Sequence, residues 1–198
     1  MSATDEQIRQ ALEALNNGEL VVFPTETLYG IGCDALNPEA VEKLCAIKKR
    51  PVGKPLAVIL GEASMVNQLT PEFSGSAARL AEAFWPGPLT LVLPAREGLP
   101  EAIVGNQTIG LRVSSDPVAA RLSRELGRPI CAPSANPTGL PPAPGARGAR
   151  AYFDKDVAVY LDDGPRDGDA STVVIPGPPP EILRIGPISE QALLKELD

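Results

Sequence analysis

The chain has no histidine among its 198 residues, and this absence excludes more chemistry than any other feature of its composition. A serine–histidine–acid triad, an H-E-x-x-H zinc site and every histidine general base are ruled out. Any reaction here must rest on lysine, arginine, acidic, hydroxyl or thiol side chains, or on backbone groups.

Cysteine is scarce as well. Cys33, Cys45 and Cys131 are odd in number, and none of them belongs to a C-x-x-C pair. A disulfide scaffold and a structural zinc site are both disfavoured by this pattern. We interpret the three thiols as small side chains that fill the core.

Long apolar runs are missing too, since none approaches the roughly 20 residues that a membrane-spanning helix needs. The first residues, 1–7, contain neither the basic start nor the apolar centre of a secretory signal. The sequence therefore predicts a cytoplasmic protein with no membrane partner. Its length fits one domain, and 43% hydrophobic residues suffice for a substantial core.

Neither of the common phosphate loops, G-x-G-x-x-G and G-x-x-x-x-G-K-[ST], occurs in the chain. A nucleotide would have to be held in another way. The net charge of −7 also argues against broad, non-specific binding of nucleic acid, which requires many cations to neutralise phosphates.

Residues 41–55 are positively charged, although the chain as a whole is negatively charged. They contain one acid, Glu42, and five cations, Lys43, Lys48, Lys49, Arg50 and Lys54. Two interpretations stay open. The cations lie at the expected end of a helix, where they complement its dipole, or they serve a phosphate or carboxylate ligand.

Hydrophobic periodicity predicts a mixture of helices and strands without strict alternation. Helices are expected after Thr4, after Asn37 as far as about Arg50, over residues 77–84, after Asp116 and after Ser189. Strands are expected at residues 20–23, 56–60, 89–93, 109–113, 130–132, 157–161, 172–175 and 182–185. We predict a single α/β domain over residues 1–198, with one large twisted mixed sheet. Residues 137–148, rich in Pro and Gly, are a linker, a lid or a wall of the site.

The exit of the first strand, residues 23–32, crowds Thr25, Glu26, Thr27 and Tyr29 into a turn with two glycines. Loops at strand ends are where α/β proteins place ligands. The alternative is a turn whose threonine hydroxyls satisfy its own backbone.

Residues 48–55 hold four cations, Lys48, Lys49, Arg50 and Lys54, beside two prolines, which restrict the loop and lower the entropy of presenting the cations. Arginine offers a planar fork to phosphate and lysine a mobile point charge. Such a cluster suits ATP.

Side chains along a strand point alternately to its two faces, so Thr108 and Arg112 would lie on the same face of a strand at residues 108–112. Arg112 stands between apolar neighbours, so its charge needs a partner. That partner is an internal acid or the carboxylate of a ligand. Ser134 and Asn136 follow a short strand, and without histidine Ser134 is no conventional triad nucleophile, although a Ser–Lys pair is conceivable.

Six ordered segments together resemble the YrdC-like family. They are residues 23–30 (FPTETLYG), 48–51 with 54–56, 85–90 (WPGPLT), 110–113, 132–136 (APSAN) and 171–174. Order and spacing match from about residue 8 to residue 187. The chain resembles the short form of the family, which lacks the extra C-terminal domain of longer relatives.

The resemblance implies an open, twisted α/β fold around a large concave basic cavity. It also implies a nucleotidyltransferase activity, threonylcarbamoyl-AMP synthesis from L-threonine, bicarbonate or CO2, and ATP, as the first step of tRNA threonylcarbamoyladenosine modification. Lys48 and Arg50 would be catalytic. Threonine would contact Thr25, Arg112 and Ser171. ATP would contact Lys48, Arg50, Lys54, Thr108, Ser134, Asn136 and Arg184.

The resemblance further implies Mg²⁺ bound with ATP, because phosphates supply the hard oxygen ligands that this ion prefers. The sequence shows no dedicated metal site. Downstream tRNA-modification proteins and weak tRNA binding are the expected partners. Two departures are noted: some relatives carry asparagine at the position of Lys54, and some longer ones carry histidine near Ile59. The alternative is a module of the same family that binds RNA or nucleotide without synthesis.

Overall fold

The computed structural model describes residues 3–197. Its helices are α1 (Asp5–Asn16), α2 (Pro38–Lys48), α3 (Gly75–Phe84), α4 (Pro117–Leu126), α5 (Ala146–Phe153) and α6 (Glu190–Lys195). Its strands are β1 (Val21–Phe23), β2 (Gly30–Gly32), β3 (Val58–Leu60), β4 (Leu89–Pro94), β5 (Thr108–Val113), β6 (Ile130–Cys131), β7 (Val159–Tyr160), β8 (Thr172–Ile175) and β9 (Glu181–Arg184). Short 3-10 turns cover Ala63–Gln68, Glu101–Ile103 and Asp154–Asp156.

The strands form two open, mixed sheets. One has six strands in the order β6-β3-β5-β4-β8-β9, and the other has three in the order β2-β1-β7. The open mixed α/β architecture is confirmed, although its strands form two ladders where one sheet was expected. Isolated bridges, Gly30 to Ser134 and Asp34 to Ile130, connect the two ladders beside β2 and β6.

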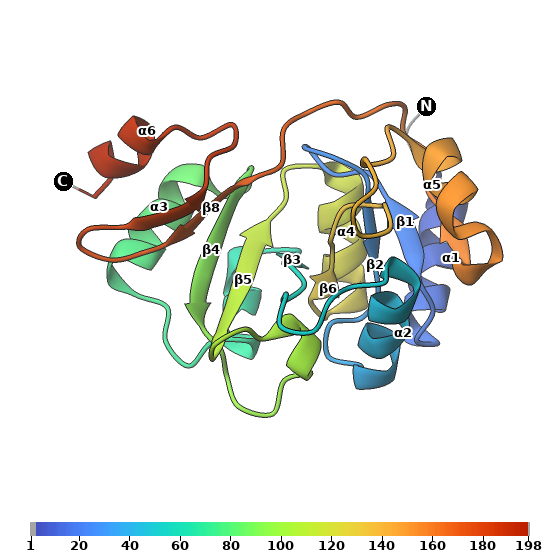
Figure 1. The fold of residues 1–198 in the computed structure, drawn as a ribbon, viewed down its shortest axis with the longest axis horizontal. Helices are drawn as coiled ribbons and strands as arrows, with labels where there is room; N and C mark the ends of the chain where they lie inside the picture. Colours follow the sequence, from blue (N-terminus) through green and yellow to red (C-terminus); the bar gives the residue numbers. More distant parts are fainter. Residues whose placement is uncertain (1–2, 198) are drawn as a thin grey trace.

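Different helices pack against the two sheets (Figure 1). α3 packs near β4 and α4 near β3, whereas α1 and α5 lie beside the three-stranded sheet. Ile8 of α1, Phe23 of β1 and Leu122 of α4 belong to one buried apolar cluster. The opposite face of β3, β4 and β5 is left free to line a cavity.

The expected helix starts are confirmed. Thr4 closes a capping box with Gln7, and the side chain of Asn37 accepts a hydrogen bond from the backbone of α2. α2 ends at Lys48, earlier than the expected Arg50, because Lys49 adopts a left-handed conformation (φ 50°, ψ 45°) and turns the chain out of the helix.

Two elements, β2 and α5, have no counterpart in the sequence prediction. β2 is a Gly-Ile-Gly strand, whose glycines give no strand signal, and it forms because it pairs with β1. α5 starts inside the Pro- and Gly-rich stretch, with Ala149 and Phe153 on its buried side. The end of the Pro- and Gly-rich stretch therefore belongs to a helix that packs against the core.

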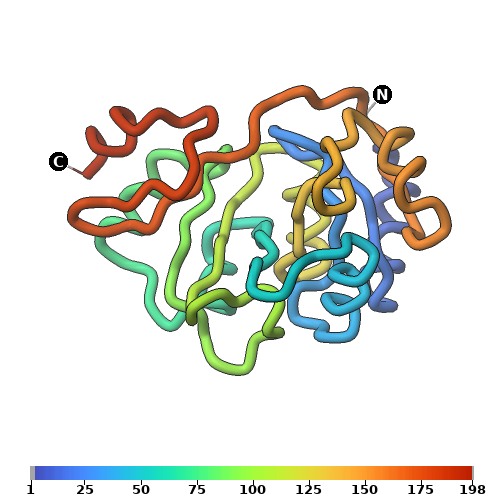
Figure 2. Tube along the Cα trace, viewed as in Figure 1, coloured from blue at the N-terminus to red at the C-terminus, as the bar shows by residue number. Residues whose placement is uncertain are grey.

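Residues 161–171, which we call the crossing segment, contain neither helix nor strand. Figure 2 shows this segment running from the three-stranded sheet to β8 at the far side of the molecule. It is the link between β7 and β8 in chain order. Within residues 3–197, no helix combines the length and the hydrophobicity needed to cross a membrane.

Candidate functional site

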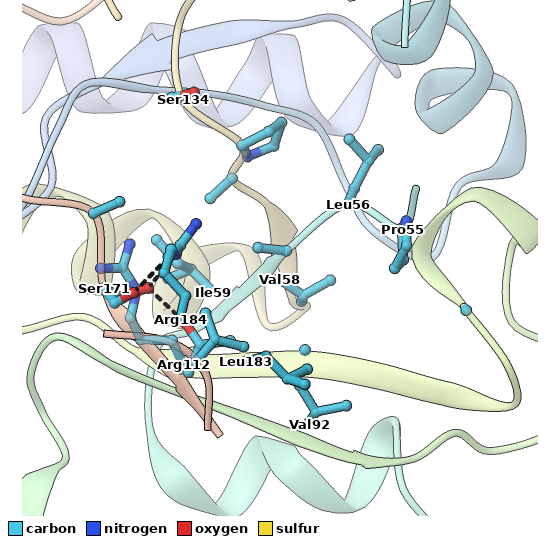
Figure 3. Close-up of a pocket in the computed structure, with 18 of the residues that line it drawn as sticks. Pro55, Leu56, Val58, Ile59, Val92, Arg112, Ser134, Ser171, Leu183 and Arg184 are labelled. Atoms are coloured by element: carbon cyan, nitrogen blue, oxygen red, sulfur yellow. Dashed lines mark hydrogen bonds between the residues drawn. The ribbon is translucent and has the colours of Figure 1, made fainter. Parts of the chain in front are cut away.

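A cavity of about 660 Å³ lies on the free face of the six-stranded sheet. One wall is the loop of residues 25–30, another is the stretch 132–134 after β6, and the floor includes β3, β4 and β5. Ser171, directly before β8, and Arg184 of β9 complete it, and Figure 3 shows Ser134 across the space from Arg112 and Arg184. Its volume is in the range typical of small-molecule sites.

Arg112 lies at one end of this cavity and is 7% exposed. Its Nη1 donates to Glu26 Oε1 at 2.6 Å and to Thr27 Oγ1 at 3.2 Å. Burial lowers the pKa of the guanidinium, while the charge of Glu26 acts in the opposite direction. The internal salt bridge that the sequence left open is therefore present.

The rest of the Arg112 guanidinium is free of protein partners. Within residues 3–197, neither its Nε nor its Nη2 donates a hydrogen bond, although the residue lines the cavity. An arginine edge with two parallel N–H groups matches the two oxygens of a carboxylate. The salt bridge and a ligand contact are thus compatible, because they use different sides of the guanidinium.

The Thr25 loop satisfies its own hydrogen bonds. Thr25 Oγ1 donates to the Leu28 carbonyl at 2.6 Å and lies 3.0 Å from Thr27 Oγ1. The turn interpretation is therefore correct, and Thr25, Thr27 and Leu28 still line the cavity. A loop with its own backbone satisfied is pre-formed, so a ligand need not order it.

Ser171 and Arg184 meet at the same end of the cavity. Arg184 Nε donates to the Ser171 carbonyl at 2.9 Å and Nη2 to Ser171 Oγ at 3.2 Å (Figure 3). Ser171 Oγ also lies 2.8 Å from Thr90 Oγ1. Partial burial lowers the pKa of Arg184.

Arg50 lines the cavity from the side of the 50–55 loop. Its Nε donates to the Lys54 carbonyl at 2.8 Å and its Nη2 to the Pro55 carbonyl at 2.6 Å. Burial lowers its pKa. Because α2 ends before Arg50, the helix-dipole interpretation does not account for this residue. Thr108 also lines the cavity, with its hydroxyl donating to the Gly105 carbonyl at 2.7 Å.

Lys48 lies outside the cavity lining, although the resemblance implied a phosphate contact. It is 2% exposed, and its Nζ lies 2.5 Å from both the Ser134 and the Asn136 carbonyl oxygens. Burial, assisted by the charge of Arg50, lowers its pKa to about 8. In this geometry Lys48 holds the backbone that carries Ser134.

Lys54 and Asn136 are also absent from the lining. Lys54 contributes to a second cavity of about 430 Å³, which shares Arg50, Gly53 and Pro55 with the first. Asn136 Nδ2 donates to the Pro137 and Leu140 carbonyls, while its buried Oδ1 has no partner among the described residues. Of the ten site residues expected from the resemblance, the structure brings seven together: Thr25, Arg50, Thr108, Arg112, Ser134, Ser171 and Arg184.

The charged residues of the lining are mostly cationic. Within the described part of the chain they are Arg50, Arg112 and Arg184 against Glu181. Among residues 3–197, no three cysteine, aspartate or glutamate side chains are grouped so that they could hold a metal ion.

Sequence reasoning gave no role to Glu26, Ser114 or Arg166. Ser114 donates to Glu26 Oε2, so Glu26 is held from both sides. The requirement that Arg112 have an acidic partner was a signal for such a residue, but it did not say which acid. Arg166 gave no signal, because the partners that tie it to the site, Thr25 and Asp116, are distant in the chain.

Comparison with known proteins adds an independent finding. A family model described as "Telomere recombination", named for Sua5, YciO and YrdC, matches residues 13–186. The chain is 39% identical over 197 residues to the threonylcarbamoyl-AMP synthase of Bacillus subtilis, covering 98% of this chain and 57% of that protein. It is 38% identical over 193 residues to a putative threonylcarbamoyl-AMP synthase of Mycobacterium tuberculosis, covering 96% and 88%.

A solved structure is similar over the same extent. The crystal structure of Pyrococcus abyssi Sua5 complexed with L-threonine superposes with a TM-score of 0.91 at 36% identity, covering 96% of this chain and 57% of that one. The chain thus spans just over half the length of the Bacillus and Pyrococcus proteins.

Proposed function

The chain belongs to the Sua5/YciO/YrdC family, and we propose that it forms threonylcarbamoyl-adenylate and pyrophosphate from L-threonine, bicarbonate or CO2, and ATP. One observation carries the proposal. A single cavity presents the free edge of Arg112 together with two further arginines, Arg50 and Arg184. A carboxylate and a polyphosphate are the ligands that this arrangement suits.

In this proposal threonine binds at the Arg112 end. Its carboxylate would take the Nε and Nη2 groups that Glu26 leaves free, and Thr25 and Ser171, which line the same cavity, would contact it. The threonine complex of the Pyrococcus relative supports this choice of amino acid.

In this proposal ATP lies along Arg50, Thr108 and Ser134, and Arg184, which is bonded to Ser171, flanks the nucleotide where the two ligands meet. The threonine amine attacks bicarbonate to give a carbamate and water. A carbamate oxygen then attacks the α-phosphorus, and the bond to the pyrophosphate oxygen breaks. Such a reaction needs positioned reactants and neutralised charge more than a strong acid or base. A site without histidine can supply both.

Magnesium would enter with ATP as part of the substrate. Among the described residues no three Cys, Asp or Glu side chains are grouped to hold it, so phosphate oxygens and water would be its main ligands. The product is a reactive adenylate, which suits transfer to tRNA by downstream modification proteins in the cytoplasm. Lys48 and Asn136 would act on ATP through the position of Ser134.

The test is a direct assay with ATP, Mg²⁺, ¹⁴C-bicarbonate and L-threonine, followed by separation of the labelled adenylate and measurement of pyrophosphate. We expect both products, and neither when threonine is omitted. Arg50→Ala should abolish turnover, whereas Arg9→Ala, which removes an exposed arginine paired with Glu6 on α1, should not. Pyrophosphate release that does not depend on threonine would refute the proposal, and retained RNA binding would then favour the binding module.

A further inference from the structure

The crossing segment lies against the loop of residues 25–30, which forms one wall of the cavity. The hydroxyl of Tyr29 donates to the Gly164 carbonyl at 2.7 Å and accepts from the Asp163 amide at 3.0 Å. Gly168 approaches the loop so closely that a Cβ there would lie 2.9 Å from the Thr27 carbonyl oxygen. The segment therefore contacts the loop at separate points along its length.

Arg166 makes the central contact between the crossing segment and the loop of residues 25–30. Its Nε donates to the Thr25 carbonyl at 3.1 Å, and its Nη1 donates to the Asp163 carbonyl at 2.8 Å. Its Nη2 donates to Asp163 Oδ2 at 2.8 Å and to Asp116 Oδ2 at 3.1 Å. All three guanidinium nitrogens are used, so the side chain has one defined orientation.

A second route leads from Arg166 to Arg112. Asp116, which Arg166 contacts, donates its backbone N–H to Ser114 Oγ at 3.2 Å, and Ser114 donates to Glu26. Glu26 in turn accepts from Arg112 Nη1. Arg166 is thus connected to two of the three proposed threonine-binding residues, Thr25 through its carbonyl and Arg112 through this chain of hydrogen bonds.

The ATP side is connected to Arg166 only indirectly, through the far end of the same loop: Gly30 pairs with Ser134, and the Tyr29 carbonyl accepts from the Ala135 amide at 2.7 Å. Arg50 is held by carbonyls of its own loop, and Ser134 follows β6 beside Lys48. None of the hydrogen bonds of Arg166 within residues 3–197 reaches these residues.

We propose that Arg166 is a positioning residue that fixes the amino-acid half of the cavity more strongly than the nucleotide half. The inference rests on the proposed function for the identity of the amino acid. Its physical content, that Arg166 orders residues 25–30, does not depend on that function.

The experiment compares Arg166→Ala, Arg166→Lys and the control Arg121→Ala by calorimetric titration with L-threonine and with ATP, each added alone. Arg121 is an apt control because it also bridges two acids, Asp5 and Glu125, but on the outer side of α4. Lysine at position 166 keeps the charge beside Asp116 and Asp163 but lacks the fork that also reaches Thr25. Hydrogen exchange at the amides of residues 25–30 is measured in the same ligand-free variants.

For Arg166→Ala we expect the Kd for threonine to rise about tenfold or more, as for the loss of hydrogen bonds from a charged donor. The Kd for ATP should change less than about threefold. Arg166→Lys should also bind threonine weakly, and amides 25–30 should exchange faster in both variants. Arg121→Ala should match the wild type in all three measurements.

Unchanged threonine binding, or equal weakening of threonine and ATP, would overturn the inference, because Arg166 would then have no role or only a general structural one. If the wild type binds no threonine, the proposed function fails. The exchange data then decide alone: faster exchange confined to residues 25–30 supports positioning, and unchanged exchange refutes it.

Discussion

Lys48 shows how burial changes what a cation can do. The sequence places it in a cluster that suits phosphate, but folding directs its ammonium group to two backbone carbonyls. Removing a charge from water disfavours the protonated form, which is why its pKa falls to about 8. A titration near this value is the measurable consequence.

The pH dependence of stability tests this environment. Between about 8 and the ordinary value of 10.5, the unfolded state binds the Lys48 proton and the folded state has released it. Stability contributed by Lys48 therefore rises as pH increases through this window. We expect the difference in unfolding free energy between wild type and Lys48→Met, measured in urea, to grow in favour of wild type over the same range. A difference independent of pH would show that Lys48 keeps an ordinary pKa.

Glu26 compensates the buried charge of Arg112. Replacing it by glutamine keeps the shape but leaves Arg112 without an opposite charge, in a pair whose side chains are 9% and 13% exposed. Disrupting such a pair costs about 3 kcal/mol of unfolding free energy, whereas Glu6→Gln in the exposed pair with Arg9 should cost under about 0.5 kcal/mol. Urea unfolding measures both, and equal losses would contradict the assigned role of Glu26.

At the scale of elements, the contact between β2 and β6 shows why a glycine strand is needed. A Cβ on Gly32 would lie 2.0 Å from the Cys131 carbonyl oxygen and 2.9 Å from the ring of Phe23. Backbone on one side and a buried ring on the other leave no room for a methyl group.

Gly32→Ala should therefore destabilise the fold by about 3 kcal/mol or more, through overpacking. Gly145→Ala is the matched control, because a Cβ at Gly145 meets nothing within 4 Å and its φ of −171° is extended backbone. The control should stay within about 0.5 kcal/mol of the wild type. Thermal unfolding compares the two variants, and a Gly32→Ala protein as stable as the control would contradict the close β2–β6 approach.

Helix boundaries were predictable where a short local signal fixes them. Asp116 caps α4 with its carboxylate and Gly127 ends it with φ 70°, as the Asp-Pro start and the glycine predict. β2 and α5 were missed because their sequences carry no such signal. Pairing with β1 and packing against the core stabilise them, and neither interaction is local.

At the scale of the whole molecule, the net charge of −7 favours the proposed synthase over an RNA-binding module. Three arginines in one cavity do not offset the acidic surface enough to neutralise many phosphates. We expect less than about 10% retention of single-stranded RNA in filter binding at physiological salt, where weak non-specific complexes dissociate. Tight, salt-resistant retention would instead support the module.

The sequence alone determined the residue types, the helix caps, the exclusion of histidine chemistry and the six segments that resemble the family, since these are local properties of the chain. Only the tertiary structure decided which of the candidate site residues come into contact with one another. Arg112 finds Glu26 across 86 residues, and Arg166 finds Thr25 across 141. It also turned Lys48 away from the cavity. Contacts over such separations depend on how the sheets pack, and no local pattern encodes them.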